Sequence, residues 1–162
     1  MKLKTNQLLL AAAVICLLSL AVMTGVLLNP VKTVAPFTPP PFEEKAENGV
    51  PVVPEMLGWG ELDAQAFKVS VCGNVIIRAD AADLWFTNPK SNEVWLKLRI
   101  LDEKGNILGE TGLLKPGQYV RTVHFDTVPK AGTPIGLKLM AYEPDTYYSA
   151  GAATLNTVVA GS

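Results

Sequence analysis

Cysteine and histidine are scarce in this chain. Its 162 residues include two cysteines, Cys16 and Cys72, and a single histidine, His124. Cys16 lies in a long apolar run and Cys72 in the region expected to fold, so the two cannot pair and no disulfide framework is predicted. A zinc site needs three or four Cys, His or carboxylate ligands, and a catalytic histidine needs a nucleophile motif beside it. The sequence offers neither, and we expect no metal, no cofactor and no enzymatic activity.

His124 and Cys72 are the residues on which any chemistry would depend. Asp126 lies two residues after His124 on the same face of an expected strand, so an exposed His–Asp pair is geometrically feasible. No nucleophile motif accompanies this pair, which favours a solvated strand histidine. Without a neighbouring base, Cys72 is expected to be a buried structural thiol.

The chain also lacks an excess of positive charge. Its 14 Lys and Arg residues nearly balance 15 Asp and Glu residues, for a formal net charge of −1. Surfaces that bind phosphate backbones concentrate Lys and Arg, so no nucleic-acid partner is expected. No glycine opens a helix in the manner of a phosphate-binding loop. Four glycines are assigned to turns: Gly105, Gly109, Gly112 and Gly117.

A long uncharged apolar run is the most prominent feature that is present. Leu8–Leu28 covers about 21 positions, close to the roughly 20 that a helix needs to cross a bilayer. A secretory signal core runs about 7–15 residues and ends in small residues, whereas this run ends in bulky ones, so a retained anchor is favoured over a cleaved signal peptide. Lys2 and Lys4 precede the run, which predicts a single-pass cell-membrane protein with a cytoplasmic N-terminus and an extracytoplasmic C-terminal domain.

A proline-rich segment follows the apolar run. Residues 30–56 carry seven prolines with acidic residues between them, a composition typical of extended polyproline II. We interpret this segment as a semi-rigid stalk. The sequence thus divides into a cytoplasmic stub and transmembrane helix at 1–29, a linker at 30–56 and a β domain at 57–162.

The β domain shows short alternating segments separated by turn residues. About seven strands over about a hundred residues predict an immunoglobulin-like antiparallel β-sandwich. In the clearest strand, 94–101, alternate residues from Val94 to Ile100 should face the core and Lys97 and Arg99 should face solvent. The other expected strands are 67–71, 75–78, 84–86, 107–111, 119–126, 135–142 and 153–159.

Exposed aromatic residues are the candidate contact site. Trp95 falls on the outward parity of its strand, and Tyr147 and Tyr148 lie in the loop 144–151. Such rings can fill a partner's pocket or stack on sugar rings. Two alternatives stay open for Trp95: a bulge that breaks the strand parity, or a linker that folds over the ring.

The turn motifs carry a family resemblance. They are Asn88-Pro89, Ser91-Asn92, Asp102-Glu103-Lys104-Gly105, Leu114-Lys115-Pro116-Gly117 and Ala141-Tyr142-Glu143-Pro144. In these motifs the chain resembles small single-pass membrane-anchored β-sandwich proteins of Gram-positive-type bacteria, mostly of unknown function and some linked to mobile or conjugative elements. The resemblance implies an architecture and no catalytic residues.

These features together lead to two functional hypotheses. The first is a non-enzymatic interaction module that docks on an envelope protein, as an accessory or structural subunit of an envelope or secretion-type assembly. The alternative is a module that binds cell-wall glycan through Trp95, Tyr147 and Tyr148.

Overall fold

The computed structural model describes residues 13–16 and 37–161. The chain forms two units, Met1–Thr38 and Pro39–Ser162. Apart from the helical residues 13–16, the expected transmembrane segment lies outside the described residues. Within the described part of the chain, no helix is both long and apolar enough to cross a membrane.

The second unit is built almost entirely of β-strands, and the all-β prediction is confirmed. Each strand expected after residue 66 is present. One 3-10 turn, η1 (Glu55–Leu57), interrupts the strands. The strands are β1 (Glu47–Asn48), β2 (Trp59–Asp63), β3 (Lys68–Cys72), β4 (Val75–Arg78), β5 (Ala81–Asn88), β6 (Trp95–Leu101), β7 (Ile107–Glu110), β8 (Gln118–His124), β9 (Pro134–Tyr142) and β10 (Ser149–Ala160).

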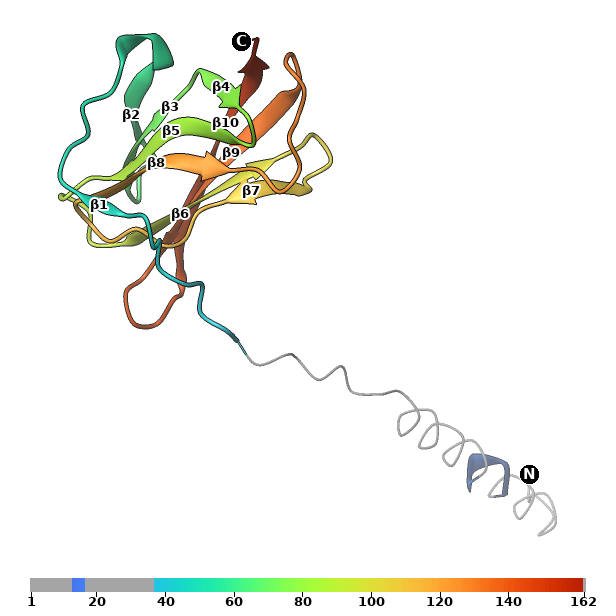
Figure 1. Cartoon of the computed structure of the whole chain (residues 1–162). Coiled ribbons are helices and arrows are strands. Elements are labelled where there is room, and N and C mark those ends of the chain that lie inside the picture. The colour runs from blue at the N-terminus through green and yellow to red at the C-terminus, as the bar shows by residue number, and fades with distance from the viewer. Residues whose placement is uncertain (1–12, 17–36, 162) are drawn as a thin grey trace. The chain divides into compact units, whose positions relative to one another are not determined.

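The strands form a curled mixed sheet (Figure 1). Neighbours follow the order β1-β8-β5-β4-β10-β9-β6-β7, and β3, with β2 beside it, branches from β5. Among the described strands, only the short pairing of β10 with β4 is parallel. A bulge in β5 between Asp83 and Phe86 shifts the register against β8. The curl brings β3 and β5 opposite β6 and β9, which encloses the core.

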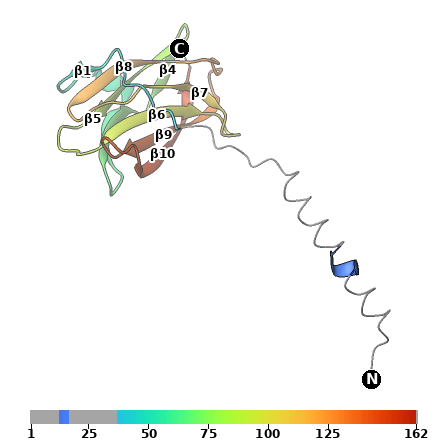
Figure 2. The same cartoon turned by 90° about the horizontal axis from the view of Figure 1, so that it is seen from below.

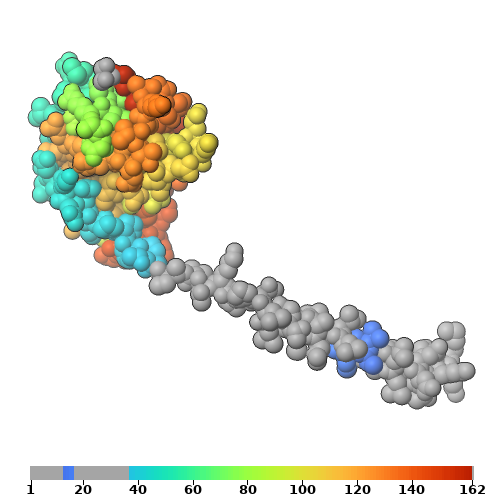
Figure 3. Space-filling model, turned by 45° about the vertical axis from the view of Figure 1, so that its right-hand side comes forward, coloured from blue at the N-terminus to red at the C-terminus, as the bar shows by residue number. Residues whose placement is uncertain are grey.

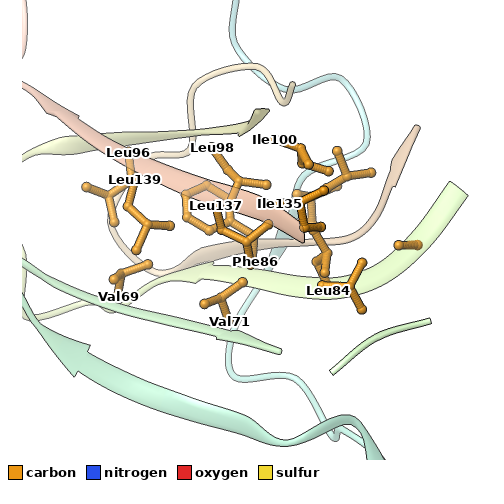
Figure 4. Packing of buried hydrophobic residues seen from close by; sticks show 14 of the residues in the cluster. Val69, Val71, Leu84, Phe86, Leu96, Leu98, Ile100, Ile135, Leu137 and Leu139 are labelled. Atoms are coloured by element: carbon orange, nitrogen blue, oxygen red, sulfur yellow. The ribbon is translucent and has the colours of Figure 1, made fainter. Parts of the chain in front are cut away.

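The core lies inside the curl (Figure 4), where side chains of β3 and β5 point toward those of β6 and β9. Three of the four residues expected to face the core from the strand at 94–101, Leu96, Leu98 and Ile100, are fully buried. The fourth, Val94, precedes β6 and is half-buried against the core. Phe86 and Leu84 of β5 are fully buried as well. Burial of apolar side chains at this density provides the main favourable contribution to folding.

Gly109 was expected to lie in a turn, and the structure places it in a strand. It lies within β7 and is buried, and a Cβ at this position would overlap the carbonyl oxygen of His124 at the end of β8. The backbone amides of Asp126 and Thr127 also donate to the carbonyl oxygen of Leu108. The absence of a side chain at Gly109 therefore lets β7 approach β8 and closes this side of the curl.

The start of the folded unit differs from the expected boundary at residue 57. The unit begins at Pro39, and Glu47–Asn48 pairs with Gln118–Tyr119 of β8. Figure 3 shows this segment, in cyan, spread over the surface beside the C-terminal half of the domain. Prolines favour an extended backbone, and an extended segment can lie along a strand as readily as it can stand free.

Candidate functional site

Three aromatic rings from distant parts of the chain meet on the outer side of β6. The Trp95 ring lies 4.8 Å from the Phe42 ring and 5.2 Å from the Tyr147 ring, both edge-to-face. The Lys115 ammonium lies 4.7 Å from the centre of the Phe42 ring. We call Phe42, Trp95 and Tyr147 the aromatic cluster. Edge-to-face pairs of this kind are favourable beyond the area that they bury.

Backbone hydrogen bonds hold Phe42 in this cluster. The Leu113 amide donates to the carbonyl oxygen of Pro41 at 2.9 Å, and the Glu43 amide donates to the carbonyl oxygen of Leu113 at 3.0 Å. The Gly112 amide also donates to the Glu43 carboxylate at 2.7 Å. Segment 41–43 is therefore fixed to the domain, and the alternative in which the linker folds over Trp95 is the one observed.

The loop between β9 and β10 positions Tyr147. Its backbone is tied by hydrogen bonds from the Tyr147 amide to the Glu143 carbonyl oxygen at 3.0 Å and from the Glu143 amide to the Tyr148 carbonyl oxygen at 2.8 Å. Asp145 and Tyr147 have positive φ angles of 65° and 58°, which non-glycine residues seldom adopt. A loop that keeps two such residues is held in one conformation by its surroundings.

The three residues predicted as contact candidates have different environments. Tyr147 packs on Trp95, and both rings are half-buried. Tyr148, the next residue in the loop, is 71% exposed. Sequence reasoning missed Phe42 and Lys115, because a contact between residue 42 and residue 95 leaves no local pattern in either segment.

Lys97 of β6 was expected to be exposed to solvent, and the structure shows it buried. Its residue exposure is only 4%, and its ammonium donates to Glu110 at 2.6 Å. Arg99 donates to the other oxygen of the same carboxylate, also at 2.6 Å. Burial alone would raise the pKa of Glu110, but the hydrogen bonds from Lys97 and Arg99 outweigh it and hold the pKa below its ordinary value. Lys97 has the outward position expected for it in the strand alternation. It is nevertheless buried, because β7 supplies the Glu110 carboxylate that covers its ammonium.

The residues considered for chemistry lie apart. His124 faces Asp80, with Nδ1 and the carboxylate oxygen 3.5 Å apart, and the Lys45 ammonium lies 3.3 Å from Nε2. The pairing with Asp126 that the sequence allowed is not the one observed. Cys72 is buried, which raises the pKa of its thiol to about 12. Among the described residues, no three His, Cys, Asp or Glu side chains are placed to share a metal ion.

A pocket of about 480 Å³ lies at another edge of the domain. Trp59 and Pro89 are among the residues that line it, together with Asn88 and Thr87 from the end of β5. Sequence reasoning did not single out this pocket, because its walls come from several separate segments. Asn88 uses its amide nitrogen on the carbonyl oxygens of Val94 and Leu114, so its role there is structural.

Comparison with protein families and with curated proteins gives no relative from which a role could be transferred. No protein family matches the chain, and no curated protein matches it. The function is therefore inferred from the residues of the chain itself.

The fixed position of Phe42 depends on Gly112. A Cβ at Gly112 would lie 2.6 Å from the Cα of Glu43, so we expect Gly112→Ala to push segment 41–43 away from Leu113. Two backbone hydrogen bonds would be lost, at a net cost of about 2 kcal/mol. Hydrogen exchange of the Glu43 and Leu113 amides should then be about 30-fold faster. Unchanged exchange at both amides would show that the segment does not need the glycine.

Proposed function

We propose that this protein is a membrane-anchored extracytoplasmic interaction module, an accessory or structural subunit of an envelope or secretion-type assembly. In this proposal Leu8–Leu28 is retained as a single-pass anchor with the N-terminus in the cytoplasm. The uncharged length of this run and the lysines before it support that topology. The domain acts by binding and carries out no reaction.

The proposed architecture of the domain is an immunoglobulin-like sandwich. One layer would contain β2, β3, β5 and β8, and the other β7, β6, β9 and β10. The strand order and the core between β5 and β6 support this assignment. Loops at the ends of such sandwiches commonly carry the binding residues, and the loop 143–148 is one of these.

The observation that carries the proposal is that Tyr148, which follows Tyr147 of the aromatic cluster in the same loop, is 71% exposed. Tyrosine supplies a large contact area with little loss of side-chain freedom, and such residues are enriched where proteins bind tightly. The cluster is already ordered by Phe42 and by the hydrogen bonds of the loop. A partner that covers Tyr148 therefore would not have to order the loop first, which favours binding.

Site-specific photocrosslinking in the cells that encode the protein tests this proposal. A photoreactive residue at position 148 should capture one reproducible membrane or envelope protein. The same residue at Val52, which is exposed and is not a member of the aromatic cluster, serves as the matched control. Equal capture at both positions, or none at 148, would contradict the proposed contact surface.

A Tyr148→Ala variant should release the captured partner. Loss of a central aromatic contact commonly costs about 2 kcal/mol or more of binding free energy, or roughly 30-fold in affinity. The measurement is co-purification of the partner with tagged full-length protein in mild detergent, with Val52→Ala alongside. Partner recovery equal to that of the wild type would remove Tyr148 from the contact.

The glycan alternative predicts a different outcome in the same cells. Position 148 would then capture wall fragments, and Trp95→Ala and Tyr147→Ala would abolish retention on isolated wall material. The packing of Trp95 between Phe42 and Tyr147 weighs against this reading, because ring surface that touches neighbours is not open to a sugar.

A further inference from the structure

The pocket of about 480 Å³ has a row of polar side chains as its floor. Ser70 of β3 lies opposite Glu61 of β2 on one side and opposite Thr87 of β5 on the other. Residues paired in this way point to the same face of a sheet, with Cβ atoms about 5 Å apart. Because Val69 and Val71 of β3 face the core, this polar row faces outward, and all three of its side chains line the pocket.

Ser70 is the member of the polar row that lacks a partner. The residue is only 4% exposed, and its hydroxyl makes no hydrogen bond within the described part of the chain. Its oxygen is open to the pocket, since Trp85 Nε1 is the one enclosed side-chain polar atom without a partner among the described residues. A hydroxyl donates one hydrogen bond and accepts two. A ligand that fills the pocket must pair with this group or leave it unsatisfied at a cost.

The other two members of the polar row are acceptors. Thr87 donates its hydroxyl proton to the carbonyl oxygen of Trp85 at 2.9 Å, so its oxygen can only accept a further bond. One carboxylate oxygen of Glu61, Oε1, accepts from Lys68 at 3.1 Å. The other oxygen, Oε2, is left to accept from a ligand. The row therefore offers more acceptors than donors, which suits a ligand that carries several hydroxyl donors.

Trp59 adds an apolar surface next to the polar row. It lies two residues before Glu61 on the same face of β2, and it lines the pocket. Its indole N–H donates to the carbonyl oxygen of Trp85 at 3.0 Å. The ring is thus held in place and offers a ligand its carbon surface. Pro89 and Pro116 extend the apolar part of the lining.

Backbone hydrogen bonds hold the walls of the pocket in position. The Gly49 amide donates to the carbonyl oxygen of Gly117, and the Gly117 amide donates to the carbonyl oxygen of Asn88, both at 2.8 Å. These bonds tie the chain after β1 and the turn before β8 to the end of β5. Figure 2 shows β1, β8 and β5 side by side. A pocket whose walls are already ordered binds a ligand without the cost of ordering them.

We propose that this pocket binds a neutral saccharide of one or two sugar rings. Sugar hydroxyls donate to Glu61 and Thr87 and exchange hydrogen bonds with Ser70, while the C–H surface of a ring packs on Trp59. The lining carries one carboxylate and one ammonium, Glu61 and Lys90, so its formal charge is balanced. An anionic ligand would meet the Glu61 carboxylate, and a wholly apolar ligand would leave the polar row unpaired.

An NMR titration of the full-length protein tests this site, in a detergent whose head group is not a sugar. The chain has three tryptophans, and Trp59→Phe identifies the indole N–H signal of Trp59. The probes are glucose, galactose, mannose, N-acetylglucosamine and their disaccharides, with trialanine as a peptide of similar size. At least one saccharide should shift the Trp59 signal saturably and leave the Trp95 signal in place.

Ser70→Ala and Glu61→Gln show whether the polar row makes the contact. Each variant removes or weakens a hydrogen bond to the ligand and should reduce affinity about tenfold. Ser91→Ala and Glu103→Gln are the matched controls, because they make the same changes at exposed residues outside the pocket. The controls should bind like the wild type. Circular dichroism checks that every variant is folded.

The proposal is overturned if no saccharide of the panel shifts the Trp59 signal saturably, or if trialanine alone does so. Saturable binding that the Ser70 and Glu61 variants leave unchanged overturns it too. A shift confined to Trp95 would place sugar binding at the aromatic cluster and not in this pocket. The pocket shares no lining residue with that cluster or with Tyr148, so this proposal and the proposed function can fail independently.

Discussion

A Gly109→Ala variant is expected to lose about 3 kcal/mol of unfolding free energy, the upper end of the usual cost of overpacking. The added Cβ would overlap the carbonyl oxygen of His124 and lie 3.3 Å from the Cα of Phe125. Both obstacles are backbone atoms, which cannot rotate away as a side chain could. β7 and β8 must therefore separate, and the curl opens on the side that they close.

The matched control for this variant is Gly60→Ala in β2. No atom lies within 4 Å of a Cβ built there, and the change should alter stability by no more than about 1 kcal/mol, because it mainly restricts the unfolded chain. Urea unfolding followed by tryptophan fluorescence measures both variants. Equal stability of the two proteins would mean that β7 and β8 separate without cost, and that the domain does not need a glycine at position 109.

Gly109 also illustrates what sequence reasoning reaches and what it misses. The strands after residue 66 were predictable because alternation of apolar and polar residues is a local signal, as in Leu96, Leu98 and Ile100. A glycine next to a turn gives the same local signal whether it bends the chain or admits a neighbouring backbone. The neighbour in this case, His124, is fifteen residues away and is identified only by the closed curl.

Only part of the aromatic cluster could be predicted, because Trp95 and Tyr147 are marked by local sequence patterns and Phe42 is not. The parity of Trp95 and the loop position of Tyr147 follow from their own segments. The pairing of β6 with β9 sets Trp95 opposite Tyr142, at the start of the loop that carries Tyr147. Phe42 comes from a proline-rich segment whose composition favours an extended backbone whether it is free or docked. The docked position depends on the absence of a side chain at Gly112. That requirement can be recognised only once Glu43 is known to lie against this glycine.

Loss of the Glu110 carboxylate is the second change with a large expected effect. The Lys97 side chain is only 5% exposed and donates to Glu110 at 2.6 Å. A Glu110→Ala variant leaves this ammonium without its carboxylate in a poorly hydrated position. Removing one partner of a fully buried pair costs about 3–5 kcal/mol, and because Glu110 is 35% exposed we expect about 3 kcal/mol.

An exposed ion pair of the same domain provides the comparison. Lys68 and Glu61 lie 3.1 Å apart with side chains that are 48% and 52% exposed. A Glu61→Ala variant should cost about 0–1 kcal/mol, because water replaces the lost partner. If the two glutamate variants are equally stable in urea, Lys97 is hydrated in solution and loses little when Glu110 is removed.

The pH dependence of stability separates the charge of Glu110 from its packing. The pKa of Glu110 is lowered in the folded protein, so the folded state binds its proton less readily than the unfolded chain does. This contribution to stability is fully present above the ordinary value of 4.5 and is lost as the pH falls through the lowered pKa.

The difference in unfolding free energy between wild type and Glu110→Ala should therefore be constant from pH 7 to about pH 5 and shrink below it. A difference that stays constant down to about pH 3 would assign the whole effect to lost packing. A difference that shrinks indicates that the carboxylate stabilises the domain by its charge on Lys97 and Arg99.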